Sequence, residues 1–412
     1  MFLSQVLSAD GSCREAVRRF LAWLGLAGHA PATPNTAAKA KARARLRERD
    51  LEDVNTRVRR AVEARAGAED LWWGRRVKVV DGSALSMPDT PANQKVYPQS
   101  ARARPGCGFP VMRLVVLFSL ATGVILGLAK AGLRVAERTL FRRLWDLLEP
   151  GDVVLGDRGF SSYAEVYCLA QAGVDSVTRK NARRRVGLTA LGRLGPGDHL
   201  VQWHKTGRAP AWLDPDAWRA MPDRLTVREI HFSVEIPGFR THSITVVTTL
   251  LDPVAFPREA FADLYRRRWM AELYLRDIKI TAHLDVLRCK SPAMIHKELL
   301  MHLIAYHLVR GLMLEAARRH SIPIHRISFK GTLTTVRTWA PVLAAARLAG
   351  LDRERLTDLL LSYIAQDPLP DRPNRVEPRA RKRRPKNYQL LNRPRHLFKE
   401  IPHRTKYEKA LS

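Results

Sequence analysis

The feature that most restricts the fold of this chain is a series of short apolar segments that begins at Val77. Strand-like segments cover 77–80, 113–120, 124–129, 153–155 and 174–178, and helix-like segments cover 137–148 and 163–172. Short apolar runs bounded by polar residues or glycine are typical of buried strands. Three strands, a helix, a strand, a helix and a strand predict a mixed α/β layer.

This order of elements is that of a ribonuclease H-like core, which is the predicted fold class of the segment. The uncharged stretch 114–129 is shorter than the roughly 20 residues of a membrane helix, and Ala121-Thr122-Gly123 interrupts it with a turn-like break. We therefore expect a strand hairpin there and no membrane partner. The N-terminus has no basic segment followed by a long apolar run, which favours a cytoplasmic location.

Changes of pattern divide the chain into five predicted regions. They are a helical N-terminal domain (1–75), the first part of the ribonuclease H-like core (76–180), a β-rich insertion (181–255), the helical completion of the core (256–320) and a helical region with a basic tail (321–412). Ser12 and Thr36 are predicted to cap the helices 14–24 and 37–49. Segments 225–236 and 241–251 flank Pro237-Gly238 and predict a hairpin, whereas 258–281 and 292–320 are predicted helices.

The charge of the chain indicates a polyanionic partner. Lys and Arg number 70 against 40 Asp and Glu, which leaves a formal net charge of +30. Such a charge repels itself in a compact state unless a polyanion such as nucleic acid offsets it. A ribosome-like binding protein and an arginine-rich proteome are the alternatives that composition leaves open.

Basic residues gather in several segments, each of which is either a phosphate contact or a solvated surface. They are Lys39, Lys41, Arg43, Arg45, Arg47 and Arg49 on one predicted helix, Arg102 and Arg104, Arg183 to Arg185, and Arg379, Arg381 to Arg384 (with Lys382) and Lys386 in the tail. Lys41, Arg43 and Arg45 are the predicted DNA contacts of the first region.

The predicted helix 258–281 carries an unusual polar stripe. The stripe consists of Tyr265, Arg268, Glu272 and Lys279, with Trp269 and Arg276 at its edge. At 3.6 residues per turn the first four lie within about 60° of one another. One face therefore presents a carboxylate among cations, a phenol and an indole, and a plain solvated helix would not need the aromatic pair there. The alternative is a surface ion pair between Arg268 and Glu272.

Two aspartates are predicted to lie at strand ends, where an apolar run meets a loop. Asp81 follows Val77–Val80, and Asp157 follows Val153–Gly156. Carboxylates brought together raise one another's pKa unless a cation intervenes. Their hard oxygen atoms suit two Mg²⁺ or Mn²⁺ ions about 4 Å apart, which catalyse phosphoryl transfer. Asp81, Asp157 and Glu272 are therefore the predicted catalytic metal ligands, although each aspartate alone is more often a turn residue.

The spacing of Tyr265, Arg268, Glu272 and Lys279 resembles the Y-(2)-R-(3)-E-(6)-K signature of the insertion-sequence-four family of bacterial DDE transposases. Further matching segments are Val80-Asp81-Gly82-Ser83, Gly156-Asp157-Arg158-Gly159 and Thr248-Thr-Leu-Leu-Asp252-Pro253. The resemblance covers about residues 78–299, with weaker similarity at 39–51, at 383–388 and at Pro394-Arg395.

The resemblance implies a ribonuclease H-like fold with an insertion between Asp157 and Glu272. It implies that these two residues and Asp81 bind metal, and that Tyr265, Arg268 and Lys279 hold phosphates. A freed 3′-hydroxyl would then form a DNA hairpin while an aromatic side chain stacks on a flipped base. Trp269 matches the helix-borne tryptophan of the family. The stacking residues considered for the insertion are Trp203, Trp212 and Trp218, each of which is more often a core residue.

The expected function is therefore cut-and-paste transposition. The partners are transposon terminal inverted repeats and target DNA, with a homodimer in the synaptic complex, in the bacterial cytoplasm and at the nucleoid when DNA is bound. Two alternatives are a catalytically inactive or domesticated DNA-binding relic and a structure-specific nuclease on the same fold. A relic is expected to have lost a carboxylate, and a nuclease does not need the set of Tyr265, Arg268 and Lys279. The tail either binds target DNA or packs on the core through 388–395.

Overall fold

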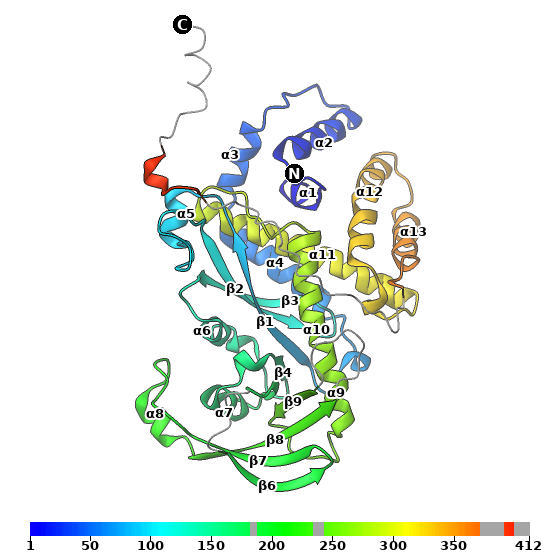
Figure 1. The fold of residues 1–412 in the computed structure, drawn as a ribbon. Coiled ribbons are helices and arrows are strands. Elements are labelled where there is room, and N and C mark those ends of the chain that lie inside the picture. Colours follow the sequence, from blue (N-terminus) through cyan, green and yellow to red (C-terminus); the bar gives the residue numbers. More distant parts are fainter. Residues whose placement is uncertain (182–187, 234–242, 371–390, 399–412) are drawn as a thin grey trace.

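The computed structural model describes residues 1–181, 188–233, 243–370 and 391–398. These residues form one nine-stranded sheet of order β3-β2-β1-β4-β5-β9-β8-β7-β6, with helices gathered around its first half (Figure 1). The strands are β1 Val77–Ser86, β2 Val111–Ser119, β3 Ile125–Gly132, β4 Val153–Gly156, β5 Asp175–Arg179, β6 Leu188–Gly195, β7 Asp198–His204, β8 Arg224–Ser233 and β9 Ser243–Thr248.

The first five strands follow the predicted order of elements. β1, β2 and β3 are antiparallel neighbours, while β4 is parallel to both β1 and β5. Helix α6 (Glu137–Arg142) lies between β3 and β4 in the chain, and α7 (Tyr163–Gln171) lies between β4 and β5. The uncharged stretch 114–129 forms the β2–β3 hairpin, as predicted. A short helix, α5 (Pro91–Val96), was not expected, and Thr90 caps it by accepting a hydrogen bond from the Asn93 amide.

The predicted β-rich insertion continues the same sheet. β9 pairs with β5 in antiparallel register, Val177 opposite Thr248, and also with β8. The predicted hairpin is present as β8–β9 with Ser233 opposite Ser243, whereas its turn at Pro237-Gly238 lies outside the described residues. Arg183 to Arg185 and the basic residues 379–386 of the tail also lie outside them. Helix α8 (Pro215–Ala220) connects β7 to β8.

A buried ion pair fixes the predicted insertion to the segment just before Arg258. Arg228 donates to both carboxylate oxygens of Asp198 at 2.8 and 2.5 Å, and their side chains are 0% and 4% exposed. The same guanidinium donates to the carbonyl oxygens of Phe256 at 2.7 Å and Asp252 at 3.3 Å. These bonds satisfy polar groups that are costly to bury unpaired.

The N-terminal helices are α1 Phe2–Leu7, α2 Cys13–Leu26, α3 Ala37–Arg45 and α4 Glu48–Glu63. Ser12 caps α2, as predicted, by accepting from the Glu15 amide. The predicted cap by Thr36 is wrong: its side chain makes no cap bond, and Asn35 accepts from the Ala37 amide instead. The helix predicted over 37–49 is broken at Leu46, where the backbone is not helical and a new helix starts.

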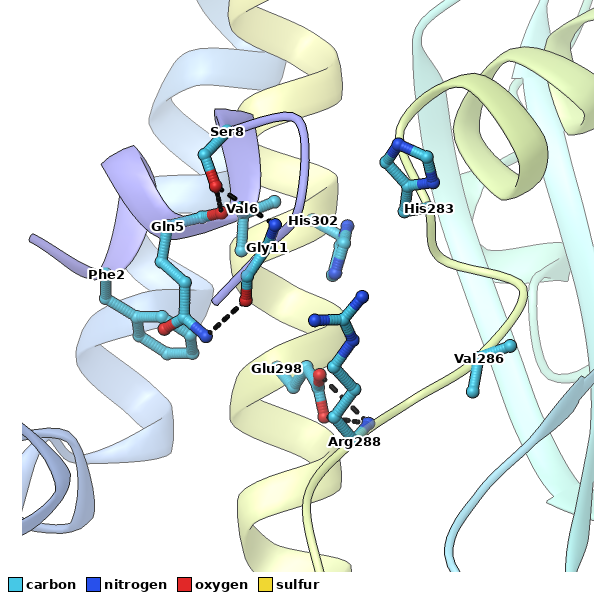
Figure 2. A pocket seen from close by; sticks show the side chains of 10 residues that line it. All are labelled: Phe2, Gln5, Val6, Ser8, Gly11, His283, Val286, Arg288, Glu298 and His302. Carbon is cyan, nitrogen blue, oxygen red and sulfur yellow. Dashed lines mark hydrogen bonds between the residues drawn. The ribbon is translucent and has the colours of Figure 1, made fainter. Parts of the chain in front are cut away.

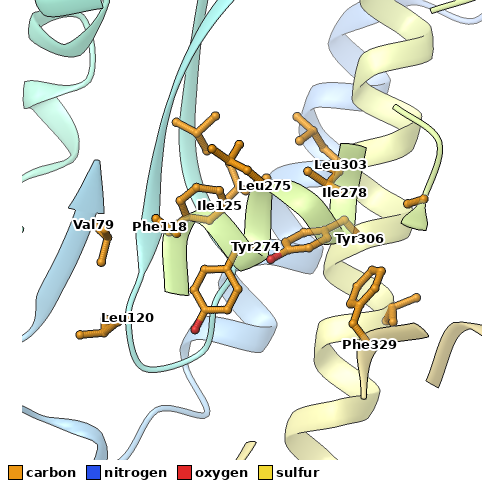
Figure 3. Packing of buried hydrophobic residues seen from close by; sticks show 14 of the residues in the cluster. Val79, Phe118, Leu120, Ile125, Tyr274, Leu275, Ile278, Leu303, Tyr306 and Phe329 are labelled. Atoms are coloured by element: carbon orange, nitrogen blue, oxygen red, sulfur yellow. The ribbon is translucent and has the colours of Figure 1, made fainter. Parts of the chain in front are cut away.

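Helix α11 (Pro292–Arg319) is the central helix of the molecule. It is long and apolar enough to cross a membrane, but 83% of its apolar window is buried inside the protein, so it is a core helix. Tyr306 and its neighbours pack with Phe118, Tyr274 and Phe329 (Figure 3). Helices α12 (Phe329–Leu348) and α13 (Arg353–Ala365) pack beside it.

The N-terminal region is fixed to this core around a small hollow of about 20 Å³, enough for one water molecule (Figure 2). Arg288 donates to the carbonyl oxygen of Asp10 at 2.7 Å, and Glu298 of α11 accepts from the backbone amides of Arg288 and Cys289 at 3.0 to 3.1 Å. The first helices therefore have a defined position on α11.

Candidate active site

Asp81 lies within a strand, not at a strand end. β1 continues to Ser86 because its second half stays paired with β2, and Asp81 lies opposite Val116. Asp157 directly follows β4, as predicted, and begins a short 3₁₀ turn. The register of β1 and β4 pairs Val77 with Val153, and the same offset sets Asp81 beside Asp157. Neighbouring strands are about 4.8 Å apart, so the two aspartates belong to one site.

The predicted helix 258–281 is a succession of three helical segments. They are α9 Arg258–Arg267, α10 Trp269–Arg276 and a π-helical turn Asp277–Thr281. Helix α10 packs on β1, and the ammonium group of Lys279 donates to the hydroxyl oxygen of Ser83 in β1 at 2.8 Å. The predicted stripe therefore faces the strand that carries Asp81. π-Helical turns are rare and often occur at functional sites.

Two of the carboxylates act electrostatically on the third, Asp81. Burial raises the pKa of Asp81, and the charges of Glu272 and Asp157 raise it further, against the Gly82 amide and Arg268, which lower it. Arg268 donates to Glu272 Oε1 at 2.8 Å. Burial opposes the charge of Arg268, yet the hydrogen bond to Glu272 and the nearby Asp157 leave its pKa raised. Arg268 is thus the cation that balances these carboxylates.

The carboxylates are close without forming a closed coordination cage. In the part of the chain that the structure describes, no three Asp, Glu, His or Cys side chains lie near enough to hold a metal ion. Carboxylates repel one another when no cation lies between them. One of the three, Glu272, already forms an ion pair with Arg268. The donor set of three carboxylates is nevertheless the hard oxygen chemistry that Mg²⁺ and Mn²⁺ require.

The aromatic members of the stripe differ in exposure. Tyr265 is 8% exposed, and burial raises its pKa to about 12. Its ring centroid lies 5.9 Å from the guanidinium carbon of Arg268, so it supports that side chain. Trp269 is 43% exposed and available to a ligand. Arg276 is exposed, and its guanidinium lies 3.6 Å from Asp277.

The predicted DNA contacts on α3 separate into two kinds. Lys41 and Arg45 are exposed. Arg43 faces the interior, where it donates to Cys289 Sγ at 2.8 Å and to Gln5 Oε1 at 3.1 Å and lies 4.3 Å from the centroid of the Phe2 ring. Arg43 therefore holds α1 to the core. Unlike Lys41 and Arg45, it does not belong to the exposed cations of α3.

The three tryptophans considered as stacking residues of the insertion are all packed. Trp203 is 1% exposed and donates to Glu229 Oε1 at 3.4 Å. The ring centroid of Trp212 lies 5.8 Å from that of Trp145, and the centroid of Trp218 lies 6.2 Å from that of Tyr163. They are core or half-buried residues, as the alternative interpretation had it.

Two neighbours of the site were missed by sequence reasoning. Ser83 bonds Lys279, and its position two residues after Asp81 on a strand places both on one face of the sheet. Asp277 is 9% exposed, and burial raises its pKa to about 6. No sequence pattern pointed to Asp277, because its burial depends on the π-helical turn.

The raised pKa of Asp277 predicts a pH-dependent stability. The folded protein disfavours the charged carboxylate. Its ionisation therefore lowers the free energy of unfolding as pH rises from about 4 through 6, by about 3 kcal/mol at neutral pH. Asp277→Asn is expected to stabilise the protein about 2 kcal/mol more at pH 7 than at pH 4.5, measured by urea unfolding. Asp263→Asn, an exposed aspartate of α9, is the control. Equal effects at both pH values would contradict the prediction.

The site therefore unites acidic side chains on a central sheet with cations and an exposed indole on the facing helix, an arrangement suited to an enzyme that acts on a phosphate polyanion. Residues 72–308 match the family described as Transposase DDE domain, and the chain belongs to this family. It is a transposase, an enzyme of the polynucleotidyl-transferase type. Enzymes of this family generally use divalent metal ions.

A curated relative supports the resemblance to the insertion-sequence-four family. The chain is 27% identical over 323 residues to the Escherichia coli transposase InsG for insertion sequence element IS4, covering 77% of this chain and 70% of the relative. Among solved structures, it is similar to a piggyBac transposase synaptic complex with hairpin DNA, at a TM-score of 0.38 and 8% identity. That match covers 72% of this chain and 57% of the other, which is less than two thirds of its length, and is too weak to define the fold.

Proposed function

We propose that this transposase cuts DNA at the terminal inverted repeats of an insertion sequence and joins the freed ends to target DNA. The observation that carries the proposal is the β1–β4 register that brings Asp81 and Asp157 to neighbouring positions, with α10 packed on β1 and the charges of Asp157 and Glu272 acting on Asp81. The similarity to an insertion-sequence transposase supports it. An inactive relic is disfavoured because all three carboxylates are present. A plain nuclease is disfavoured because it does not need Arg268 and Lys279, which accompany the carboxylates.

The proposed core is ribonuclease H-like. Three antiparallel strands followed by two parallel ones, in the order β3-β2-β1-β4-β5, support this assignment. The proposed regions are the DNA-end-binding domain 1–75, the core 76–180, the insertion 181–255, the helical completion 256–320 and the region 321–412. The insertion then shares its sheet with the core through the β5–β9 pair.

Asp81, Asp157 and Glu272 are proposed to hold two Mg²⁺ or Mn²⁺ ions. When bound, such ions activate an attacking oxygen and stabilise a leaving one. The residues of the chain provide the rest. Arg268 and Lys279 orient the phosphate next to the cleaved bond, and the buried ring of Tyr265 keeps Arg268 in place.

Further DNA contacts are proposed for exposed residues around the site. Trp269 and Arg276 lie on the surface of α10, and Lys41 and Arg45 lie on α3. The working form is proposed to be a homodimer that pairs two transposon ends in the bacterial cytoplasm.

A cleavage assay tests whether excision leaves a hairpin. We expect a plasmid with two inverted repeats to release a fragment with covalently closed ends on denaturing gels, and a plasmid with one repeat to remain intact. Trp269→Ala is expected to lower hairpin yield about 10-fold, because base stacking on an aromatic side chain contributes about 1–3 kcal/mol. Ile280→Ala, which trims another exposed apolar side chain of the same helical run, should leave the yield unchanged. Open ends alone would exclude the hairpin route.

A further inference from the structure

A second hollow, of about 500 Å³, lies where β1 begins. Its walls come from the end of α4, the connection 66–72, the first residues of β1, the end of β2 and Arg267 at the end of α9. Its volume is in the range of pockets that bind small molecules, about 300–1,000 Å³. Lys78 in its wall and Asp81 are three residues apart, about 10 Å along the strand, so this cleft is separate from the carboxylates.

Three arginines of the cleft form no ion pair with the residues that the structure describes. Arg59, Arg60 and Arg267 line it, and within the described residues none of them forms an ion pair or a side-chain hydrogen bond. Burial, and next the charge of Arg60, lower the pKa of Arg59 against the smaller, opposite effect of Glu63. Five basic side chains line the cleft against three acidic ones, so its positive charge is in excess, and an anion bound there would be stabilised.

The acidic groups of the same cleft are already engaged. Glu63 accepts a hydrogen bond from the hydroxyl of Thr122 at 2.6 Å, Glu149 pairs with Arg76, and Asp70 accepts from the Gly67 amide at 3.0 Å. They offset part of the positive charge of the cleft, and Glu63 acts on Arg59 without a direct ion pair. Guanidinium groups bind phosphate oxygens through paired, charge-assisted hydrogen bonds.

The remaining wall of the cleft is apolar. Trp72 is 6% exposed and packs against Phe256 and Phe261, with ring centroids 5.8 and 5.5 Å apart. Leu71, Leu120 and Leu147 complete this side. A ligand that fits both walls carries a phosphate at one end and a flat, poorly solvated group at the other, which is the chemistry of a nucleotide.

We propose that this cleft is a second, non-catalytic binding site for a nucleotide, with its phosphate on Arg59, Arg60 and Arg267 and its base against the apolar wall. The nucleotide is either one unit of a DNA strand or a free nucleoside phosphate. Arg267 lines the cleft while the next residue, Arg268, pairs with Glu272, so the ligand would bind at the α9–α10 junction, one residue along the chain from that ion pair. The site does not depend on the metal assignment of those carboxylates.

Binding measured without metal tests this proposal separately from catalysis. The probes are a 5′-phosphorylated octathymidylate and free dTMP, titrated by isothermal calorimetry in EDTA against the full chain. Arg59→Ala with Arg267→Ala is compared with Arg57→Ala with Arg266→Ala, a matched pair from the same two helices that lies outside the cleft lining and removes the same charge. Ala66→Leu, which fills the cleft without changing charge, is a second variant.

We expect the cleft pair and Ala66→Leu to weaken binding at least about 10-fold, and the matched pair to change it less than about 2-fold, with equal melting temperatures throughout. A loss for the oligonucleotide alone identifies a DNA strand as the ligand, and a loss for dTMP as well identifies a free nucleotide. Equal losses in the two double variants, or no binding of either probe by the wild type, would overturn the proposal.

Discussion

Glu272→Gln is expected to lower metal-dependent cleavage of a plasmid carrying the repeat ends by at least about 1,000-fold, equivalent to about 4 kcal/mol of activation free energy. Glutamine keeps the shape of the side chain and can still accept a hydrogen bond from Arg268, but it removes the charge that a divalent ion requires. Asp81→Asn is expected to have the same effect. Binding of end DNA, measured by gel shift, should be retained in both variants.

Glu259→Gln is the matched control for this experiment. Glu259 lies in the first turn of α9, and its side chain is 81% exposed, so cleavage should stay at the wild-type rate. Cleavage that survives both Glu272→Gln and Asp81→Asn would place the active site elsewhere. A wild-type protein that binds ends but never cuts them, across metals and paired-end conditions, would be an inactive relic.

Asp198→Ala is expected to reduce the free energy of unfolding by about 3–5 kcal/mol, because it leaves the buried guanidinium of Arg228 without its counter-ion. The effect should extend to catalysis, since Arg228 also holds the carbonyl oxygens of Asp252 and Phe256 just before α9. Urea unfolding followed by tryptophan fluorescence measures the stability, and plasmid cleavage measures the activity.

An exposed ion pair gives the comparison. Asp216 pairs with Arg219 on α8, and both side chains are more than 70% exposed. Asp216→Ala should leave the unfolding midpoint unchanged, because exposed ion pairs contribute little. A similar small effect of Asp198→Ala would mean that the buried pair is not a main support of this part of the sheet.

The order of elements in the first half of the sheet could be predicted because each strand is a short apolar run with clear ends. The pairing of β9 with β5 could not, because it joins segments on either side of an insertion and depends on tertiary packing. The strands of the predicted β-rich insertion could be identified from their alternation of apolar and polar residues. Their continuity with the core sheet could not, because no local pattern encodes the pairing of distant strands.

The candidate site divides in a similar way. The stripe from Tyr265 to Lys279 could be predicted because it depends on helical periodicity alone, and it faces β1 even though a junction and a π-helical turn divide the helix. Asp81 was misplaced at a strand end because the polar residues after it hide the second half of β1, which β2 holds in register. Arg43 was grouped with exposed cations because composition does not tell which face of α3 turns inward.

The β5–β9 pair also has a consequence for the synthesis of the chain. Val177 leaves the ribosome about 70 residues before its partner Thr248, an interval of about 4 to 14 s at ordinary rates of translation. During this interval β5 is an open sheet edge, and such edges promote aggregation. Nascent chains that stall before β9 emerges would therefore be prone to aggregate. The β5 edge of the core sheet is protected only after the insertion has been synthesised.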